Sequence, residues 1–195
     1  MPYPHTPSSA GLDEDEPAWQ WLARDLASTP EQQARVWLAP RLDCTPDTVP
    51  LQRTPRGRPR LLAAHVQALH TRHDISWSHS GHGLLVAHAR DAVVGVDLEY
   101  ERSRRHVLAL AHRYFHPDEV AWLSTQTDET AQQSAFIRFW CAKEAVLKAH
   151  GHGLAFGLDR LRFLERDGSL HLHACDAALG IAAQWRLREL QPMPG

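Results

Sequence analysis

The chain has 195 residues, of which 43% are hydrophobic, enough for one domain or for two small lobes that share a core. A formal net charge of −2 argues against a generally nucleic-acid-binding surface, although local basic patches are compatible with it. Cys44, Cys141 and Cys175 form no CxxC pair, which fits a reducing compartment. Because the sequence has neither a signal-peptide pattern nor an apolar run of about 20 residues, it predicts a soluble cytoplasmic protein with no membrane partner.

The N-terminal part has weak periodicity. Residues 1–17 are rich in proline, serine and acidic residues, and we expect a disordered tail. Residues 18–42 have helical character in two pieces that break near Thr29 and Pro30, since proline favours a first helical turn. The proline-rich residues 43–60 predict an extended loop with room for one short strand, and residues 61–70 have no clear period.

Strand patterns occur on both sides of a helical section. The helical section has a 3.6-residue period at 103–114, a start signal at Pro117, and its strongest helix at 132–150, which should end at Gly151. Alternating and apolar runs predict strands at 74–80, 83–90 and 92–99, a hairpin at 161–176 and a last strand at 181–190. The pattern predicts an α+β fold and permits two lobes, at 18–102 and 103–190.

Two carboxylates end an apolar run at residues 93–96. Asp97 and Glu99 are separated by one residue, so on a strand they point to the same face, with backbones roughly 6–7 Å apart. Their oxygens could converge on one cation, and Gly95 would permit another backbone or a ligand to approach closely. The alternative is a strand end whose last residues leave the core and meet water, and for this pair taken alone that is the favoured interpretation.

The helix at 132–150 supplies a third acid. Glu144 lies among residues expected to be buried and needs a partner there, although a surface ion pair with Lys148 is the simpler alternative. A metal ion held by Asp97, Glu99 and Glu144 would be that partner, and three carboxylates suit Mg²⁺. Lys143 and Lys148 would then bind phosphate.

Two further segments offer anion donors. The SWSHSGHG segment presents Ser78 and His79, whose hydroxyl, imidazole and backbone groups can bind an anion. Residues 53–60 carry four arginines held by proline and glycine, which form either a phosphate clamp or a solvated basic loop.

These features together resemble one family. The motifs GRP (57–59), SHSG (78–81), GVDLE (95–99) and WCAKEAVLK (140–148) follow one another at about the separations seen in the 4′-phosphopantetheinyl transferase superfamily. The resemblance is to the larger, monomeric type that activates surfactin synthetase, and it covers roughly residues 35–190. Residues 1–34 do not match the family pattern.

The resemblance implies an activity and a fold. The enzyme would transfer the phosphopantetheine arm of coenzyme A to a serine of an apo acyl or peptidyl carrier protein and release adenosine 3′,5′-bisphosphate. It would have two pseudo-symmetric α+β lobes with the active site between them.

The resemblance also assigns residues to roles. Asp97, Glu99 and Glu144 would bind Mg²⁺, for which Mn²⁺ is a possible substitute. Lys143 and Lys148 would lie near the pyrophosphate, Ser78 and His79 would contact coenzyme A phosphates, and Arg58 would lie near the 3′-phosphate. Glu119 matches a position that often carries an acid near the metal. The base that takes the serine proton stays open between Glu144, Glu119 and a metal-bound water.

Four arginines follow the carboxylate pair within residues 101–115. Carriers in these reactions are acidic near the target serine, so Arg102, Arg104, Arg105 and Arg113 could dock one, unless they form only a solvated helix face. A Mg²⁺-dependent phosphohydrolase explains the acids but not the ordered basic motifs. The intact acids weigh against a degenerate, non-catalytic binder of coenzyme A or carrier. A metal site at His171, His173 and Cys175 competes with a polar strand face, which this alternation more often means.

Overall fold

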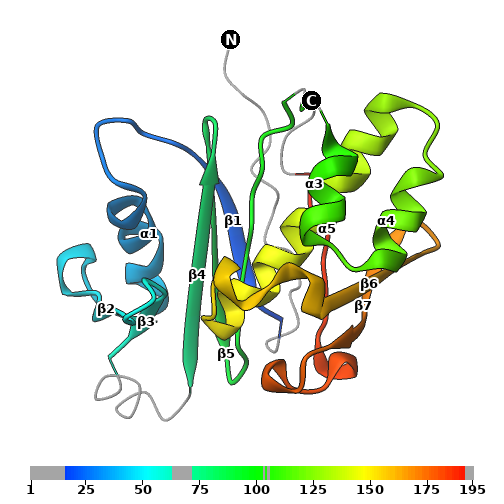
Figure 1. Cartoon of the computed structure of the whole chain (residues 1–195). Coiled ribbons are helices and arrows are strands. Elements are labelled where there is room, and N and C mark those ends of the chain that lie inside the picture. Colours follow the sequence, from blue (N-terminus) through cyan, green and yellow to red (C-terminus); the bar gives the residue numbers. More distant parts are fainter. Residues whose placement is uncertain (1–15, 63–71, 103, 105, 192–195) are drawn as a thin grey trace.

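The computed structural model describes residues 16–62, 72–102, 104 and 106–191, and it confirms the α+β class. A three-stranded antiparallel sheet of order β1-β5-β4 lies in the middle of the molecule (Figure 1). Helix α1 and the β2–β3 hairpin lie on one side of it, and α3, α4 and the β6–β7 hairpin on the other, with α5 between (Figure 1). None of the helices in these ranges is both long and apolar enough to cross a bilayer.

The strands are β1 (Ala18–Ala23), β2 (Leu51–Arg53), β3 (Pro59–Leu61), β4 (His73–Ser80), β5 (Gly83–Arg90), β6 (Leu161–Arg166) and β7 (Ser169–Cys175). The α-helices are α1 (Pro30–Leu38), α3 (Val107–Tyr114), α4 (Pro117–Ser124) and α5 (Glu129–His150).

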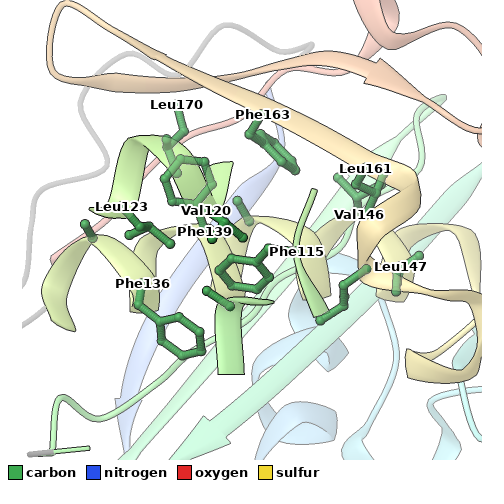
Figure 2. Packing of buried hydrophobic residues seen from close by; sticks show 14 of the residues in the cluster. Phe115, Val120, Leu123, Phe136, Phe139, Val146, Leu147, Leu161, Phe163 and Leu170 are labelled. Carbon is green, nitrogen blue, oxygen red and sulfur yellow. The ribbon is translucent and has the colours of Figure 1, made fainter. Parts of the chain in front are cut away.

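Two large hydrophobic clusters form the interior. The N-terminal cluster packs α1 against β4 and β5, through side chains such as Trp37, Leu38, Ile75 and Leu84. The C-terminal cluster joins α3, α4, α5 and the β6–β7 hairpin, and Figure 2 shows its phenylalanine side chains gathered between these elements. The predicted lobe boundaries stay a prediction, and two separate clusters are consistent with them.

The first predicted helical piece is wrong. Residues 18–23 form β1, which pairs with β5 in a register that places Trp21 opposite Leu85. Pairing satisfies the backbone of a segment that would be too short for a stable helix. The second piece is confirmed as α1, where Thr29 and Gln32 form a capping box around Pro30.

Residues 92–100 run beside β4 without forming the predicted strand. Their backbone N–H groups donate to side chains of β4: Val94 to Asp74 at 2.8 Å, Val96 to Ser76 at 3.1 Å and Tyr100 to Ser80 at 2.9 Å. Alternate side chains of β4 thus replace the backbone acceptors of a ladder. The segment keeps the two-residue period of a strand, but it is joined to the sheet through side chains of β4 instead of through backbone pairing.

Most remaining elements follow the sequence pattern. Helix α5 and its end at Gly151, with φ 87°, are confirmed, as are the start of α4 and the β6–β7 hairpin with its turn at Asp167 and Gly168. Helix α3 begins later than predicted, at Val107.

Two other segments differ from their predictions. The segment 43–60 holds two short strand pieces rather than one. The strand predicted at 181–190 is wrong. This segment pairs with no strand among the described residues, and it packs on the C-terminal cluster through Trp185. Residues 1–15 of the predicted tail and 63–70 of the unassigned segment lie outside the described residues.

Candidate active site

A cavity of about 860 Å³ opens beside the motif residues. It is lined from separate elements: the start of α1, β2, the end of β4, residues 97–99 and one face of α5. The lining includes Ser78, His79, Asp97, Glu99, Glu144 and Lys148, which are six of the residues nominated from the sequence. The fold therefore brings together side chains that are up to 70 positions apart, as in the pair Ser78 and Lys148.

Asp97 lies at the centre of a polar cluster. Its Oδ1 accepts from Lys148 Nζ at 2.5 Å and from Ser78 Oγ at 2.9 Å, and Lys148 Nζ also donates to Ser78 Oγ at 2.8 Å. The Asp97 side chain is only 6% exposed, and its Oδ2 is buried without a hydrogen-bond partner among the described residues. A buried carboxylate oxygen in this state is costly, so it is suited to a ligand that the protein itself does not supply.

Gly95 explains why Asp97 can reach α5. A Cβ atom at this position would lie 2.5 Å from the backbone nitrogen of Ala149 and closer still to the carbonyl oxygen of Ala145. Glycine alone lets the two backbones approach this closely. The close approach predicted for Gly95 is confirmed, and the partner is the backbone of α5.

The other two acids flank Asp97. Glu99 accepts from Arg104 at 2.9 Å, while burial raises the pKa of its carboxyl group. Burial also raises the pKa of Glu144, and the negative charge of Asp97 adds to that shift. The three carboxylates therefore affect one another electrostatically, which favours a cation among them.

His79 and Cys141 complete the surroundings. Burial lowers the pKa of His79, with further contributions from the positive charges of Arg24 and Lys148. Cys141, which the sequence analysis did not nominate, lies beside the acids, and burial raises the pKa of its thiol, assisted by Asp97 and Glu99. Its place in the WCAKEAVLK motif was the available signal.

The far side of the cavity was not assigned from the sequence. Arg53 forms an ion pair with Glu31 at 2.8 Å, and its guanidinium carbon lies 5.4 Å from the centre of the Trp77 ring. Both Arg53 and Trp77 line the cavity, as does Arg35. The basic loop at 53–60 was the signal for Arg53, but only the fold places it opposite α5.

The roles predicted for Lys143 and Glu119 at the active site are wrong. Lys143 is 0% exposed, and its Nζ lies 2.7 Å from Glu119 Oε2 and 2.8 Å from the carbonyl oxygen of Leu158. Glu119 also accepts from the backbone N–H of Phe163 at 2.7 Å. This pair is closed within the C-terminal core, so neither residue faces the cavity as a phosphate ligand or a base.

Arg58 also departs from its predicted place. It is 6% exposed, and its guanidinium donates to Asp74 at 2.5 Å and to the carbonyl oxygen of Lys148 at 2.6 Å. Its donors are directed into the protein rather than toward a bound 3′-phosphate.

The fit to a metal ion rests on the donor set. Within residues 16–62, 72–102, 104 and 106–191, no three His, Cys, Asp or Glu side chains are arranged so that they could hold a metal ion as they stand; this includes His171, His173 and Cys175. Asp97, Glu99 and Glu144 nevertheless line one cavity, and Asp97 Oδ2 has no hydrogen-bond partner in the described part of the chain. Oxygen donors of this kind fit a hard divalent cation.

Comparison with known proteins identifies the class. The family model described as the 4′-phosphopantetheinyl transferase superfamily matches residues 93–190, half of the chain. The chain belongs to this superfamily, as the resemblance of its motifs indicated. The match begins just before the GVDLE motif and includes all of α5.

Individual relatives agree with the family. A Synechocystis protein provisionally named as a 4′-phosphopantetheinyl transferase is 34% identical over 130 residues, which are 65% of this chain and 50% of the relative. The Nostoc 4′-phosphopantetheinyl transferase HetI is 38% identical over 116 residues, covering 59% of this chain and 45% of HetI. The Bacillus pumilus 4′-phosphopantetheinyl transferase psf-1 is 37% identical over 100 residues, covering 51% and 41%. The chain thus spans half or less of the length of these relatives.

Proposed function

We propose that this chain transfers the 4′-phosphopantetheine group of coenzyme A to a serine of an apo acyl or peptidyl carrier protein. The observation that carries the proposal is the cluster of Asp97, Ser78 and Lys148 in a cavity that Glu99, Glu144 and His79 also line. Membership of the superfamily supports it. Relatives such as HetI are named as 4′-phosphopantetheinyl transferases, which supports phosphopantetheine as the group transferred.

The chemistry is a phosphoryl transfer. The carrier serine Oγ attacks the β-phosphorus of coenzyme A, and the bond from that phosphorus to the bridging oxygen breaks, which releases adenosine 3′,5′-bisphosphate. Lys148 and His79 donate to phosphate oxygens as negative charge develops. Of the acids considered as the base, Glu119 is enclosed with Lys143, whereas Glu144 lines the cavity. Of these two acids, Glu144 is therefore the one placed to accept the serine proton.

A divalent cation, Mg²⁺ in the first place, completes the proposed site. Asp97, Glu99 and Glu144 would hold it, with Asp97 Oδ2 as the free oxygen. When bound, such an ion neutralises charge on the pyrophosphate oxygens. Lys148 forms an ion pair with Asp97, and Arg104 forms one with Glu99.

The carrier is proposed to dock beside residues 97–104. Arg102 lies with its guanidinium carbon 5.6 Å from the ring centre of the exposed Tyr100, and Arg113 is exposed on α3. Arg104 is engaged by Glu99, so its charge reversal would also disturb the acids, and Arg105 lies outside the described residues. Reversal of charge at Arg102 and Arg113 should raise KM for an acidic carrier without changing KM for coenzyme A; an unchanged KM for the carrier would reject this surface.

One experiment tests the function. The chain is incubated with coenzyme A, Mg²⁺ and an apo carrier protein, and the carrier is weighed by mass spectrometry. A gain of one phosphopantetheine group supports the proposal. Consumption of coenzyme A without modification of the carrier would indicate a phosphohydrolase instead, and bound but unchanged coenzyme A would indicate a non-catalytic binder.

The proposal also covers the oligomeric state and the location of the enzyme. We expect a monomer in the cytoplasm, where the free thiols of Cys44, Cys141 and Cys175 stay reduced. Light scattering behind size-exclusion chromatography measures the first of these, and a dimer mass would contradict it.

A further inference from the structure

We propose that Arg58 is a positioning residue, which aligns Lys148 with Asp97 by holding the two backbone segments that carry them. The inference rests on the proposed transferase function of the Asp97 site. This positioning role takes the place of the one that the family resemblance implies for Arg58 in the GRP motif, which is a contact with the coenzyme A 3′-phosphate.

Arg58 reaches one of these segments through Asp74. Its NH2 group donates to Asp74 Oδ2 at 2.5 Å, and the same oxygen accepts the backbone N–H of Val94 at 2.8 Å. Val94 lies three residues before Asp97 on the extended segment 92–100, whose other N–H contacts to β4 are to neutral serine hydroxyls. A charge-assisted bond is stronger than those, so Asp74 holds the backbone of the segment on the sheet more strongly than Ser76 or Ser80 does.

Arg58 reaches the second segment directly. Its Nε donates to the carbonyl oxygen of Lys148 at 2.6 Å, in the last turn of α5. The carbonyl groups of a last helical turn lack partners within the helix, so an arginine there replaces a missing bond. Gly151 lies just beyond, and a Cβ atom on it would come within 3.0 Å of Arg58 Cδ, which shows how closely this helix end is packed on Arg58.

The two contacts form a bridge around the active site. One end of Arg58 fixes the segment of Asp97, and the other fixes the helical turn of Lys148, whose Nζ meets Asp97 Oδ1 at 2.5 Å. The planar guanidinium holds both contacts at fixed directions, which lysine cannot do. Arg58 thus acts on the reaction through the placement of Lys148 and Asp97 rather than by touching the substrate.

The burial of Arg58 separates this role from phosphate binding. Nε and NH2 are used within the protein, and Arg58 is not among the residues that line the cavity. The side chain as a whole is 5% exposed. A 3′-phosphate would need an exposed donor, and Arg53 on the cavity wall is exposed.

The test compares two donors, coenzyme A and 3′-dephospho-coenzyme A, with three variants. Arg58→Lys keeps the charge but loses the fork of donors, and Asp74→Asn keeps the shape but weakens the ion pair. Arg60→Lys is the matched control, because Arg60 lies two residues after Arg58, in β3, with its side chain exposed. Kinetics are measured well below the unfolding temperature of each variant, and hydrogen exchange is measured on segments 94–97 and 148–152.

The proposal expects kcat to fall by about 10- to 100-fold in Arg58→Lys and Asp74→Asn with both donors, because misplacement of catalytic groups by about 1 Å has effects of this size. The preference for coenzyme A over the dephosphorylated donor, as a ratio of kcat/KM, should stay within about twofold of wild type. Amide exchange should become about tenfold faster in both segments together. Arg60→Lys should match wild type in every measurement.

Two results would overturn the proposal. A loss confined to coenzyme A, with the dephosphorylated donor unaffected, would make Arg58 a 3′-phosphate ligand. Unchanged kcat together with unchanged amide exchange in both variants would show that Arg58 does not hold the two segments in place. If the wild-type chain modifies no carrier, the proposed function fails, whereas the exchange measurement still decides whether Arg58 holds the two segments.

Discussion

Replacement of Lys143 by methionine tests whether this lysine lies in the core or binds the pyrophosphate of coenzyme A. The motif WCAKEAVLK contains two lysines, and the family resemblance places both near the pyrophosphate. In the structure Lys143 is buried with Glu119, and Lys148 lies in the cavity with Asp97. Lys143→Met should therefore reduce stability and leave the binding of coenzyme A intact.

The size of the effect follows from what the variant leaves behind. Lys143 Nζ contacts Glu119 and the carbonyl oxygens of Leu158 and Leu161, all in the C-terminal core. Removal of the ammonium leaves the Glu119 carboxylate buried without its counter-charge, which typically costs about 3–5 kcal/mol. For a protein of this size, that corresponds to a fall in Tm of roughly 6–20 °C.

A second substitution should recover part of this loss. Glu119→Gln removes the charge but keeps an oxygen for the N–H of Phe163, which Glu119 accepts at 2.7 Å. The double variant Lys143→Met with Glu119→Gln should therefore be more stable than Lys143→Met alone, since a buried unpaired charge costs more than a buried amide. Urea unfolding of the four members of this cycle gives the coupling energy.

Lys148→Met is the reciprocal control. The Lys148 side chain is 33% exposed and lines the cavity, so its loss should lower transfer and coenzyme A affinity far more than stability. Titration calorimetry with coenzyme A and Mg²⁺ is run on both variants in their folded temperature range. Unchanged stability in Lys143→Met, combined with weakened coenzyme A binding, would refute the placement of Lys143 in the core.

Three further outcomes are expected. Asp97→Ala or Glu144→Ala should lower kcat by at least about 100-fold without changing the circular dichroism spectrum, and near-normal turnover in both would contradict the site. Gly95→Ala should destabilise the chain by about 1–3 kcal/mol in urea unfolding, because its Cβ would overlap the backbone of α5, and an unchanged midpoint would show that the two segments are not in close contact. Burial, together with nearby positive charges, lowers the pKa of His88 from 6.5 to about 4, so folding favours its neutral form and stability is lost as the pH falls below about 6.5. Between pH 7 and pH 5 that loss is about 2 kcal/mol, and His88→Gln should flatten it whereas His82→Gln, on an exposed turn, should not; equal slopes in all three proteins would reject the assignment.

Local patterns predicted the elements whose signals are complete within a few residues. Helix α5 has a long apolar period and a glycine stop, and the β6–β7 hairpin has its own turn residues, Asp167 and Gly168. Strand β1 lacks such a signal, since it is stabilised by β5, more than 60 positions later in the chain. Helical propensity in residues 18–23 is a weak preference, and the distant partner overrides it.

The segment before Asp97 shows a subtler limit of sequence patterns. Its alternation predicts that Asp97 and Glu99 point to one side, and both line the cavity, although Leu98 between them lines it too. The pattern could not reveal that Asp74, Ser76 and Ser80 would supply the acceptors, because side-chain and backbone acceptors leave the same two-residue period. Polar side chains at every second position of β4 were the available signal.

Helix geometry explains why one motif serves two purposes. Successive residues turn by 100°, so Glu144 and Lys148 are separated by about 40° around the axis, whereas Lys143 and Lys148 are separated by about 140°. One face of α5 therefore presents Glu144 and Lys148 to the cavity, while Lys143 enters the core and joins Glu119 of α4. Because a shift of α5 by a single residue would turn each side chain by about 100°, the buried pair also determines which acid and which lysine meet Asp97.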